Sequence, residues 1–296
     1  MLQIKINGIF VFDSHPNSMK HISVYTIAIT VLLLAGCSPK NKSFQFIQIS
    51  DPQLRFTRET GIDGTSDFQL DSLHLEQAVA RVNDLRPAFV IITGDLVHDK
   101  DNEYDLQIYS RIIGKVDASI PVYNLPGNHD IRNGNDEAQI DAFIRRYGSD
   151  RFCFEYNGSK FIGLNSCVIR DSNTTREEEQ FNWLSSELAL AKEKGEPVYV
   201  FAHCPVFVDS FDEELSYHSF QPEKRRRYWN LFKEGGVKAM IAGHLHYNKT
   251  TSYEDIENIV TGPSGYSFEQ GGNKEGFRLW TISPDSFFSE FICLSR

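Results

Sequence analysis

Five short groups of residues in this 296-residue chain carry side chains that can bind metal ions. Imidazole and carboxylate ligands together suit Mn, Fe and Zn, and a carboxamide oxygen adds a neutral donor. Two divalent ions about 3.5–4 Å apart need a bridging anion, and an Asp carboxylate can bind both ions. Asp95 is the natural bridge, and Gln53 could complete the ligand shell that Asp51 begins. The groups read Asp51-Pro52-Gln53, Gly94-Asp95, Gly127-Asn128-His129-Asp130, His203, and Gly243-His244-Leu245-His246.

Each group taken alone is weak evidence, because Asp, Gly and Pro are frequent in turns. A single His or Asp after a strand is more often a cap or a turn residue than a ligand. The joint pattern is stronger, because every group follows an apolar run and glycine, which allows close backbone approach, precedes three of them. We therefore interpret the five groups as parts of one metal site.

The apolar runs before these groups are expected to be buried β-strands. Amphipathic segments at 70–85 and 176–195 have helical spacing, and residues 152–166 predict a hairpin that turns at Asn157-Gly158. Strands that alternate with helices predict an α/β fold with largely parallel strands. Ligands bind at the carboxyl ends of such strands, so five strands bring their polar groups to one place. The predicted strands cover residues 44–50, 88–93, 121–125, 197–202 and 237–242.

The order of the motifs resembles that of the calcineurin-like metallophosphoesterase family, whose pattern runs D-x-H, G-D, G-N-H-[DE], H and G-H-x-H. This chain reads DPQ, GD, GNHD, HCP and GHLH over Asp51 to His246. The resemblance implies an α/β sandwich of two mixed β-sheets flanked by helices. It also implies two divalent metal ions, for which we favour Mn, with Fe, Zn or Mg as alternatives.

The resemblance also assigns roles to individual residues. The first ion would be held by Asp51, Gln53, Asp95 and His246, and the second by Asp95, Asn128, His203 and His244. A hydroxide between the two ions would attack phosphorus, while the ions and Asn128 neutralise the phosphate oxygens. His129 would protonate or stabilise the departing oxygen, with Asp130 orienting its ring.

Gln53 departs from the family pattern, which has His at this position. In having Gln here, the chain resembles two branches of the family. They are the calcineurin-like phosphoesterase-domain-containing protein 1 group and the manganese-dependent ADP-ribose/CDP-alcohol diphosphatases. The remaining motifs favour the first branch and predict a phosphomonoesterase that acts on a small phosphorylated substrate or a phosphoprotein. A nucleotide phosphodiesterase or pyrophosphatase is the enzymatic alternative, and a metal-containing lipoprotein binding module without turnover is the non-enzymatic one.

The first 36 residues predict a lipoprotein signal peptide, and we expect translation to start at Met19. That start is followed by a basic residue, by an apolar run from 22 to 35, and by Leu34-Ala-Gly-Cys37. The sequence of Leu34-Ala-Gly-Cys37 resembles a bacterial lipobox. The apolar run is short for a membrane span, although an uncleaved helix is the alternative. We expect residues 37–43 to be a tether lipidated at Cys37 and residues 44–296 to be the enzyme domain. The protein would then be exported and anchored to a membrane of the bacterial cell envelope.

Composition limits the class of partner. With 41% hydrophobic residues and a net charge of −10, the chain can build a sizeable core and is too acidic to bind nucleic acid through its phosphates.

Several other polar and aromatic residues have ordinary interpretations. We expect a solvated face for Arg225 to Arg227 and a solvated loop for His98 and Asp99, whose alternative is support of a metal ligand. Tyr266 and Phe268 could stack on a nucleobase.

Overall fold

The structure is a computed structural model that describes residues 42–56, 67–171, 174–268 and 274–295. The predicted signal peptide and the lipidation residue Cys37 lie outside the described residues. Lys40–Arg296 forms one compact unit, and the fold below is that of this unit.

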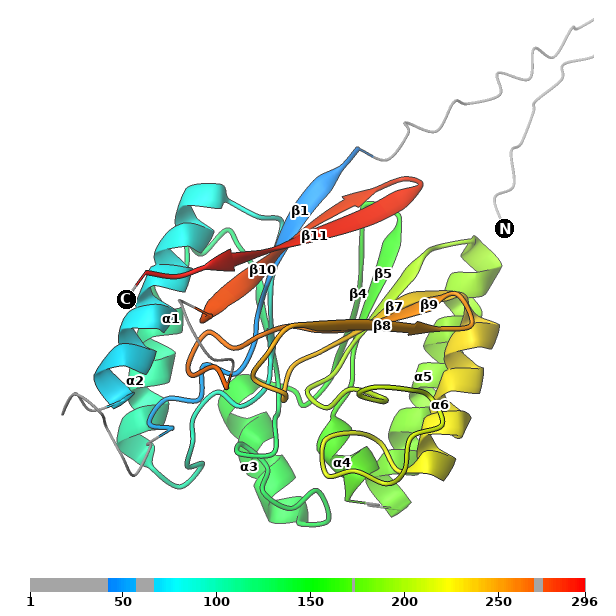
Figure 1. Cartoon of the computed structure of the whole chain (residues 1–296), viewed down its shortest axis with the longest axis horizontal. Coiled ribbons are helices and arrows are strands. Elements are labelled where there is room, and N and C mark those ends of the chain that lie inside the picture. Colours follow the sequence, from blue (N-terminus) through cyan, green and yellow to red (C-terminus); the bar gives the residue numbers. More distant parts are fainter. Residues whose placement is uncertain (1–41, 57–66, 172–173, 269–273, 296) are drawn as a thin grey trace, which may run out of the picture. The chain divides into compact units, whose positions relative to one another are not determined.

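The first sheet has five strands in the order β11-β10-β1-β2-β3 (Figure 1). Its parallel part consists of β1 (Phe44–Ile49), β2 (Val90–Thr93) and β3 (Val122–Leu125). The hairpin of β10 (Gly276–Ser283) and β11 (Ser286–Cys293) adds two antiparallel strands beside β1. Three of the predicted strands therefore lie side by side with the same direction.

The second sheet has six strands in the order β4-β5-β6-β7-β9-β8. Strands β5, β6, β7 and β9 are parallel, whereas β4 and β8 pair antiparallel at the two edges. The predicted hairpin at Asn157-Gly158 is confirmed, because both residues have the positive φ that a tight turn between β4 and β5 needs. The strands are β4 (Phe152–Tyr156), β5 (Ser159–Gly163), β6 (Val198–Phe201), β7 (Val237–Ala242), β8 (Lys249–Tyr253) and β9 (Ile256–Val260).

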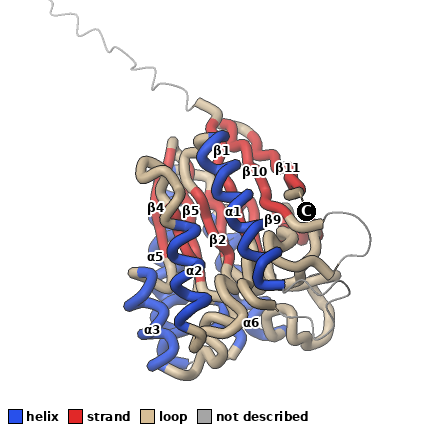
Figure 2. Tube along the Cα trace, turned by 90° about the vertical axis from the view of Figure 1, so that its left-hand side faces the viewer, coloured by secondary structure: helices blue, strands red, loops and turns tan. Residues whose placement is uncertain are grey.

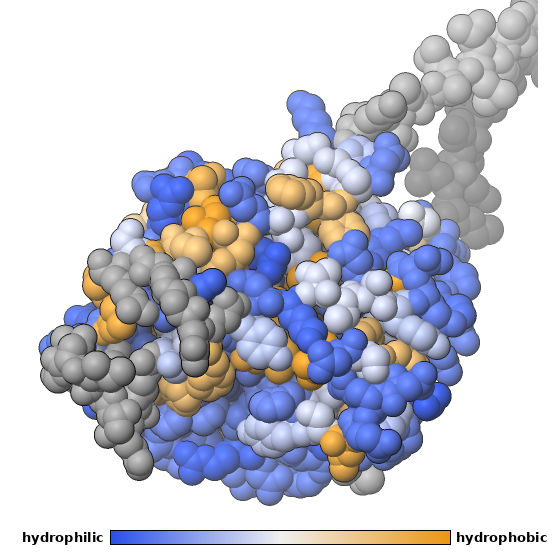
Figure 3. Space-filling model, in the orientation of Figure 1, coloured by the Kyte–Doolittle hydropathy of each residue, from blue (hydrophilic) through white to orange (hydrophobic). Residues whose placement is uncertain are grey.

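Helices flank the two sheets on their outer sides. In Figure 2, α1 and α2 lie in front of the first sheet, and Figure 1 shows α5 and α6 beside the second sheet. The face shown in Figure 3 is mostly hydrophilic over α5 and α6, as expected for helices that turn one side to water. The helices are α1 (Asp67–Leu85), α2 (Glu103–Ile113), α3 (Glu137–Tyr147), α4 (Ser166–Arg170), α5 (Thr174–Lys194) and α6 (Pro222–Gly235).

Alternate residues of the central strands enter two different apolar clusters. On β1, Phe46 packs between the sheets with Phe161 and Trp280, whereas Ile47 and Ile49 pack outward in the cluster that includes the α1 residues. Strands covered on both faces need apolar residues at nearly every position, which explains the continuous apolar runs in the sequence. The predicted α/β sandwich of two mixed sheets flanked by helices is therefore confirmed.

One expectation about α6 is wrong. Arg225 does not belong to a solvated face, because its side chain is 1% exposed and its guanidinium donates to the carbonyl oxygens of Phe211, Glu213 and Phe220. Arg226 is exposed, as predicted. Three consecutive arginines do not show from the sequence which of them is buried. On this helix, one of the three turns inward.

Candidate metal centre

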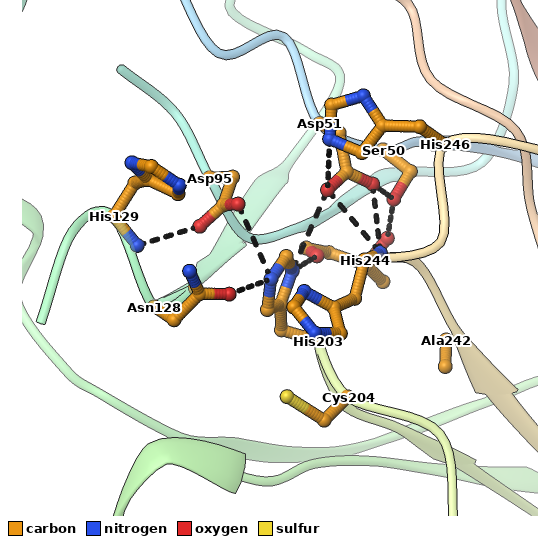
Figure 4. Close-up of polar contacts among 12 residues, drawn as sticks. Ser50, Asp51, Asp95, Asn128, His129, His203, Cys204, Ala242, His244 and His246 are labelled. Atoms are coloured by element: carbon orange, nitrogen blue, oxygen red, sulfur yellow. Dashed lines mark hydrogen bonds and ion pairs between the residues drawn. The ribbon is translucent and has the colours of Figure 1, made fainter. Parts of the chain in front are cut away.

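The five predicted groups meet where β1, β2, β3, β6 and β7 end (Figure 4). Asp51, Asp95 and His246 bring ligand atoms within 4.8 Å of one another. Asp51 lies 3.6 Å from Nε2 of His246 and 3.8 Å from Nδ1 of His203, measured from its Oδ1. Loops that are up to 195 residues apart in the chain thus converge on one point, as the strand-end pattern predicted.

A second group lies next to the first. Nε2 of His203 is 3.0 Å from Oδ1 of Asn128 and 3.3 Å from Oδ2 of Asp95. The ligand atoms of His203 and His244 lie within 4.8 Å of each other and of the Cys204 thiol. Asp95 therefore stands beside both groups, which is the position that a bridging carboxylate needs.

Two buried polar atoms of the site have no hydrogen-bond partner among the described residues. They are Oε1 of Gln53 and Nε2 of His244. Both side chains are nearly inaccessible to water, with exposed fractions of 1% and 7%. A buried acceptor without a partner is costly unless a ligand satisfies it, and both atoms are types that coordinate divalent metals. The residues present therefore fit a metal centre, and Gln53 fits it as a ligand.

The backbone at these ligands adopts an uncommon conformation. Asp51, Gln53, Asp95, His244 and His246 have φ values of 46°, 37°, 51°, 71° and 56°, in the left-handed region. Residues other than glycine cost about 1–3 kcal/mol each there, and such strain is concentrated at functional sites. The strand ends are thus bent so that each side chain turns into the centre.

Motif glycines let the loops approach closely. A Cβ at Gly127 would lie 2.1 Å from Oδ1 of Asp95, and one at Gly243 would lie 1.9 Å from Oγ of Ser50. Gly94 has a φ of 85°, and its Cβ would meet the backbone of Gly127. The glycines that precede the ligands are therefore needed for space as well as for turning the chain.

Hydrogen bonds behind the ligands fix their orientation. Nδ1 of His203 lies 2.9 Å from the carbonyl oxygen of Thr93, and Nδ1 of His246 lies 2.5 Å from that of Tyr266. A ring nitrogen that donates to a carbonyl leaves Nε2 as the free acceptor, so both rings present Nε2 to the centre. The hydroxyl of Ser50 donates to Asp51 in the same way.

Gln48 holds the two sheets together beneath the centre. Its amide nitrogen donates to the Thr93 hydroxyl at 3.1 Å and to the Ala242 carbonyl oxygen at 3.2 Å. Its oxygen accepts from the Thr261 hydroxyl at 2.7 Å and from the Trp280 indole at 3.3 Å. The strand ends that carry Asp51, Asp95 and His244 are thereby joined through one side chain.

Burial and opposite charge act against each other in the centre. Burial raises the pKa of Asp51 despite the neighbouring histidines, whereas His203 lowers the pKa of Asp95 in spite of burial. Burial opposes the charged form of His203, but the neighbouring carboxylates raise its pKa well above the usual value. Burial and the charge of His203 together lower the pKa of His244 well below the usual value.

His129 lies beside the ligands, and its ring is not held by Asp130 as we had expected. Nδ1 of His129 lies 2.8 Å from the carbonyl oxygen of His98, and its backbone N–H donates to Asp95 at 2.8 Å. The Asp130 carboxylate turns back into its own loop and accepts from the N–H groups of Leu96 and Gly127. Burial and the nearby Asp95 raise the pKa of Asp130 to about 8. Asp130 therefore shapes the loop that carries Asn128 and His129.

The sequence profile of calcineurin-like phosphoesterases matches residues 44–248, which include all five motifs. This chain belongs to the calcineurin-like phosphoesterase family. Members of the family use a dinuclear divalent metal centre, and the two adjacent ligand groups provide candidate ligands for it. The protein is accordingly a metallophosphoesterase, a hydrolase that acts on phosphoric ester bonds.

The chain is similar to proteins named as phosphatases and to proteins named as phosphodiesterases. The chain is 29% identical over 269 residues to the rat protein named serine/threonine-protein phosphatase CPPED1, covering 86% of this chain and 85% of the relative. A Psychrobacter protein named probable cyclic nucleotide phosphodiesterase is 26% identical, covering 74% of this chain and 66% of the relative. The similarity to the CPPED1 group, which the DPQ motif indicated, is confirmed.

Solved structures have the same fold. A dimetal phosphatase from Danio rerio matches with a TM-score of 0.60 and 16% identity, covering 83% of this chain and 98% of that structure. A purple acid phosphatase from yellow lupin matches with a TM-score of 0.63 and 16% identity, covering 86% of this chain and 52% of that structure. These matches confirm the calcineurin-like sandwich.

The structure adds residues that the family motifs do not contain. The Tyr217 hydroxyl accepts from Nδ2 of Asn128 at 3.2 Å, and its ring lies 5.5 Å from that of His244. The ring of His98 stacks on that of His129 with centroids 4.6 Å apart. We had expected a solvated loop at His98, but its carbonyl oxygen and ring both hold His129. Only the position of His98, four residues after the Gly94-Asp95 motif begins, could have indicated this role.

Proposed function

We propose that this protein is a phosphomonoesterase that hydrolyses phosphate esters with two divalent metal ions, for which Mn²⁺ is our preferred choice. The observation that carries the proposal is the pair of adjacent ligand groups beside Asp95, in which Oε1 of Gln53 and Nε2 of His244 have no partner among the described residues. The similarity to relatives named serine/threonine-protein phosphatase supports the monoester class.

The ligand sets combine residues of the two groups with the roles that the family resemblance implies. Asp51, Gln53, Asp95 and His246 would hold the first ion, and Asp95, Asn128, His203 and His244 would hold the second. When bound, the ions would polarise the phosphoryl oxygens and supply a water-derived nucleophile near neutral pH.

The chain itself would orient the ester and handle the proton. Asn128, held by Tyr217 through its amide nitrogen, would face a phosphoryl oxygen and stabilise the charge that develops there. His129, with Nδ1 fixed by the carbonyl of His98, presents Nε2 for proton transfer. Water would add to phosphorus, the ester bond from phosphorus would break, and the proton on Nε2 would pass to the departing oxygen. The products are inorganic phosphate and an alcohol.

The test is hydrolysis of a phosphomonoester, a phosphodiester and ADP-ribose by the purified protein, each with Mn²⁺, Mg²⁺, Zn²⁺ or EDTA. We expect turnover of the monoester with Mn²⁺ and loss of that turnover in EDTA. Bound metal without turnover of any ester would contradict the proposal and favour a metal-containing binding module.

A nucleotide phosphodiesterase or pyrophosphatase is the second candidate. It is favoured by the similarity to Psychrobacter and Rhodococcus proteins named probable cyclic nucleotide phosphodiesterase. Faster turnover of the phosphodiester or of ADP-ribose than of the monoester, in the same assay, would select this candidate.

We further propose that Cys37 is lipidated after export and that the enzyme acts at the membrane of a bacterial cell envelope. The Leu34-Ala-Gly-Cys37 sequence supports this proposal. Among the described residues, no helix is long and apolar enough to cross a membrane. The substitution Cys37→Ser should move the protein from the membrane fraction to the soluble fraction of a bacterial host. Unchanged membrane association would contradict lipidation at Cys37.

A further inference from the structure

An aromatic surface borders the candidate metal centre on the side of the first ligand group. It consists of Phe56, Tyr266 and Phe268, which we name the aromatic rim. The ring of Phe268 stacks on His246 with centroids 4.7 Å apart and an interplanar angle of 26°. The ring of Phe56 lies 5.4 Å from His246 and stacks on Tyr266 at 5.7 Å. Phe268 is 55% exposed, so an apolar ring face is accessible directly beside a metal-ligand candidate.

The aromatic rim also reaches the candidate proton donor. The ring of Phe56 lies 5.3 Å from that of His98, which in turn stacks on His129. Aromatic rings therefore continue from His129 to His246 along one border of the centre. A general acid must lie within hydrogen-bond reach of the oxygen that it protonates. The group attached to that oxygen, the leaving group, is the part of a substrate that would lie along this border.

The border of the centre beside Asn128 and His244 has a different chemistry. There, the Tyr217 hydroxyl meets Asn128, and the guanidinium of Arg170 lies 5.5 Å from the Tyr217 ring. Arg170 is fixed by two hydrogen bonds to Asp171, at 2.8 and 3.0 Å. We name Tyr217 and Arg170 the polar border. Hydroxyl and guanidinium groups suit phosphoryl oxygens, whereas the aromatic rim offers flat apolar faces.

We propose that the aromatic rim binds a flat aromatic or heteroaromatic leaving group, so that aryl or nucleoside phosphomonoesters are preferred over phosphoserine and phosphothreonine. Aromatic rings in contact prefer stacked or edge-to-face geometry, and this preference adds to the gain from burying their surface. Phe268 offers an exposed aromatic side chain for such a contact. The inference rests on the proposed phosphomonoesterase function, because that function makes His129 the neighbour of the leaving group.

Equilibrium binding separates recognition from turnover. The Mn²⁺-loaded protein would be titrated by calorimetry with methylphosphonate, phenylphosphonate and the phosphonate analogue of AMP, none of which can be hydrolysed. At least one aromatic ligand should bind about tenfold more tightly than methylphosphonate, as one good ring contact and its buried area allow. Tighter binding of phenylphosphonate would identify an aryl group, and tighter binding of the AMP analogue would identify a nucleobase. Equal affinities for all three ligands would overturn the proposal.

The matched substitutions are Phe268→Ala and Phe288→Ala. Phe288 is a phenylalanine of β11 with a similar exposure of 64%. It pairs with Thr281, which pairs with Gln45 near the start of β1, whereas the motifs follow the ends of the strands. Phe268→Ala should reduce the aromatic preference, the ratio of the two affinities, to about threefold or less. Phe288→Ala should change neither affinity. Equal effects of the two substitutions on the aromatic preference would also overturn the proposal.

Turnover of phenyl phosphate, AMP and phosphoserine completes the test. Faster hydrolysis of an aromatic ester, measured as kcat/KM, would support the aromatic rim as a determinant of specificity. No hydrolysis of the three esters together with intact preference for an aromatic phosphonate would contradict the phosphomonoesterase function while supporting the aromatic rim as a binding surface.

Discussion

The floor of the candidate centre and its borders are built in opposite ways. The floor consists of the metal-ligand candidates, and each of these side chains is 7% exposed or less. The borders carry Tyr217 and Phe268, which are 62% and 55% exposed. The floor residues are Asp51, Gln53, Asp95, Asn128, His203, His244 and His246.

This difference separates the chemistry of the site from its selectivity. Floor residues follow buried strands and contact one another, so a change at one affects the others. Five of the seven also adopt strained backbone conformations. The border residues Tyr217 and Phe268 lie on loops and contact the floor through their rings and, for Tyr217, one hydrogen bond. Substitutions in the floor should therefore remove metal or stability, whereas those at the borders should change affinity or rate with the metals retained.

Asp95→Ala should have the largest effect, because this carboxylate lies beside both ligand groups. We expect loss of both ions and a fall in turnover on the order of a thousandfold, the consequence of losing several kcal/mol of charge stabilisation. Mass spectrometry of metal content and hydrolysis of a monoester check this prediction. Retention of both ions would show that Asp95 does not bridge them.

His129→Ala tests whether a residue between the floor and the aromatic rim acts without holding metal. Its Nδ1 contacts the carbonyl of His98, and its ring stacks on that of His98. We expect turnover to fall by about a hundredfold to a thousandfold, as when a general acid is removed, with metal content unchanged. Metal loss equal to that of Asp95→Ala would place His129 in the floor.

The residues of the floor could be grouped from the sequence because they follow short apolar runs that are typical of buried strands. Strand ends of parallel sheets meet at one edge, so Asp51, Asp95 and His203 could be brought together without coordinates. The strained φ values and the Gln48 contacts could not be predicted, because both depend on how two sheets meet. The two-sheet arrangement itself came from the family resemblance, since strand alternation alone does not divide strands between sheets.

The borders were largely inaccessible to sequence reasoning. Tyr217 lies in an irregular loop between β6 and α6 without a repeating pattern, so nothing in the sequence places its hydroxyl beside Asn128. For Asp130, the sequence predicted a contact that the structure does not have. Its position next to His129 suggested a pair, but the Asp130 carboxylate accepts from a backbone N–H group of its own loop instead. Phe268 was recognised as an aromatic residue that could stack, but its contact with His246 required the structure.

Gln48→Ala should destabilise the floor without removing a metal ligand. Gln48 is fully buried and hydrogen-bonds to side chains of both sheets, so its removal leaves Thr93, Thr261 and Trp280 short of a partner. We expect a loss of about 2–3 kcal/mol in the free energy of unfolding, the cost of buried polar groups left unsatisfied. Urea denaturation measures it, and Gln45→Ala, at an exposed position of the same strand, is the control. Equal stability of the two variants would show that Gln48 does not brace the sheets.

Tyr217→Phe should have the smallest effect and sharpens the comparison most, because it removes one hydroxyl from the polar border and keeps the ring. An ordinary tyrosine hydroxyl keeps its proton at neutral pH. It can then donate to a phosphoryl oxygen while it accepts from Asn128. Loss of one such hydrogen bond should lower kcat about tenfold with metal content and unfolding free energy unchanged.

The matched control for Tyr217→Phe is Tyr156→Phe, which removes an exposed hydroxyl from the hairpin of β4 and β5. This variant should keep the wild-type kcat. If Tyr217→Phe lost metal, the hydroxyl would belong to the floor through Asn128, and the separation between buried chemistry and exposed selectivity would fail on this side of the centre. If Tyr217→Phe kept both its metal content and the wild-type kcat, the contact between Tyr217 and Asn128 would have no role in catalysis. Only the aromatic rim would then remain as a border that acts on the substrate.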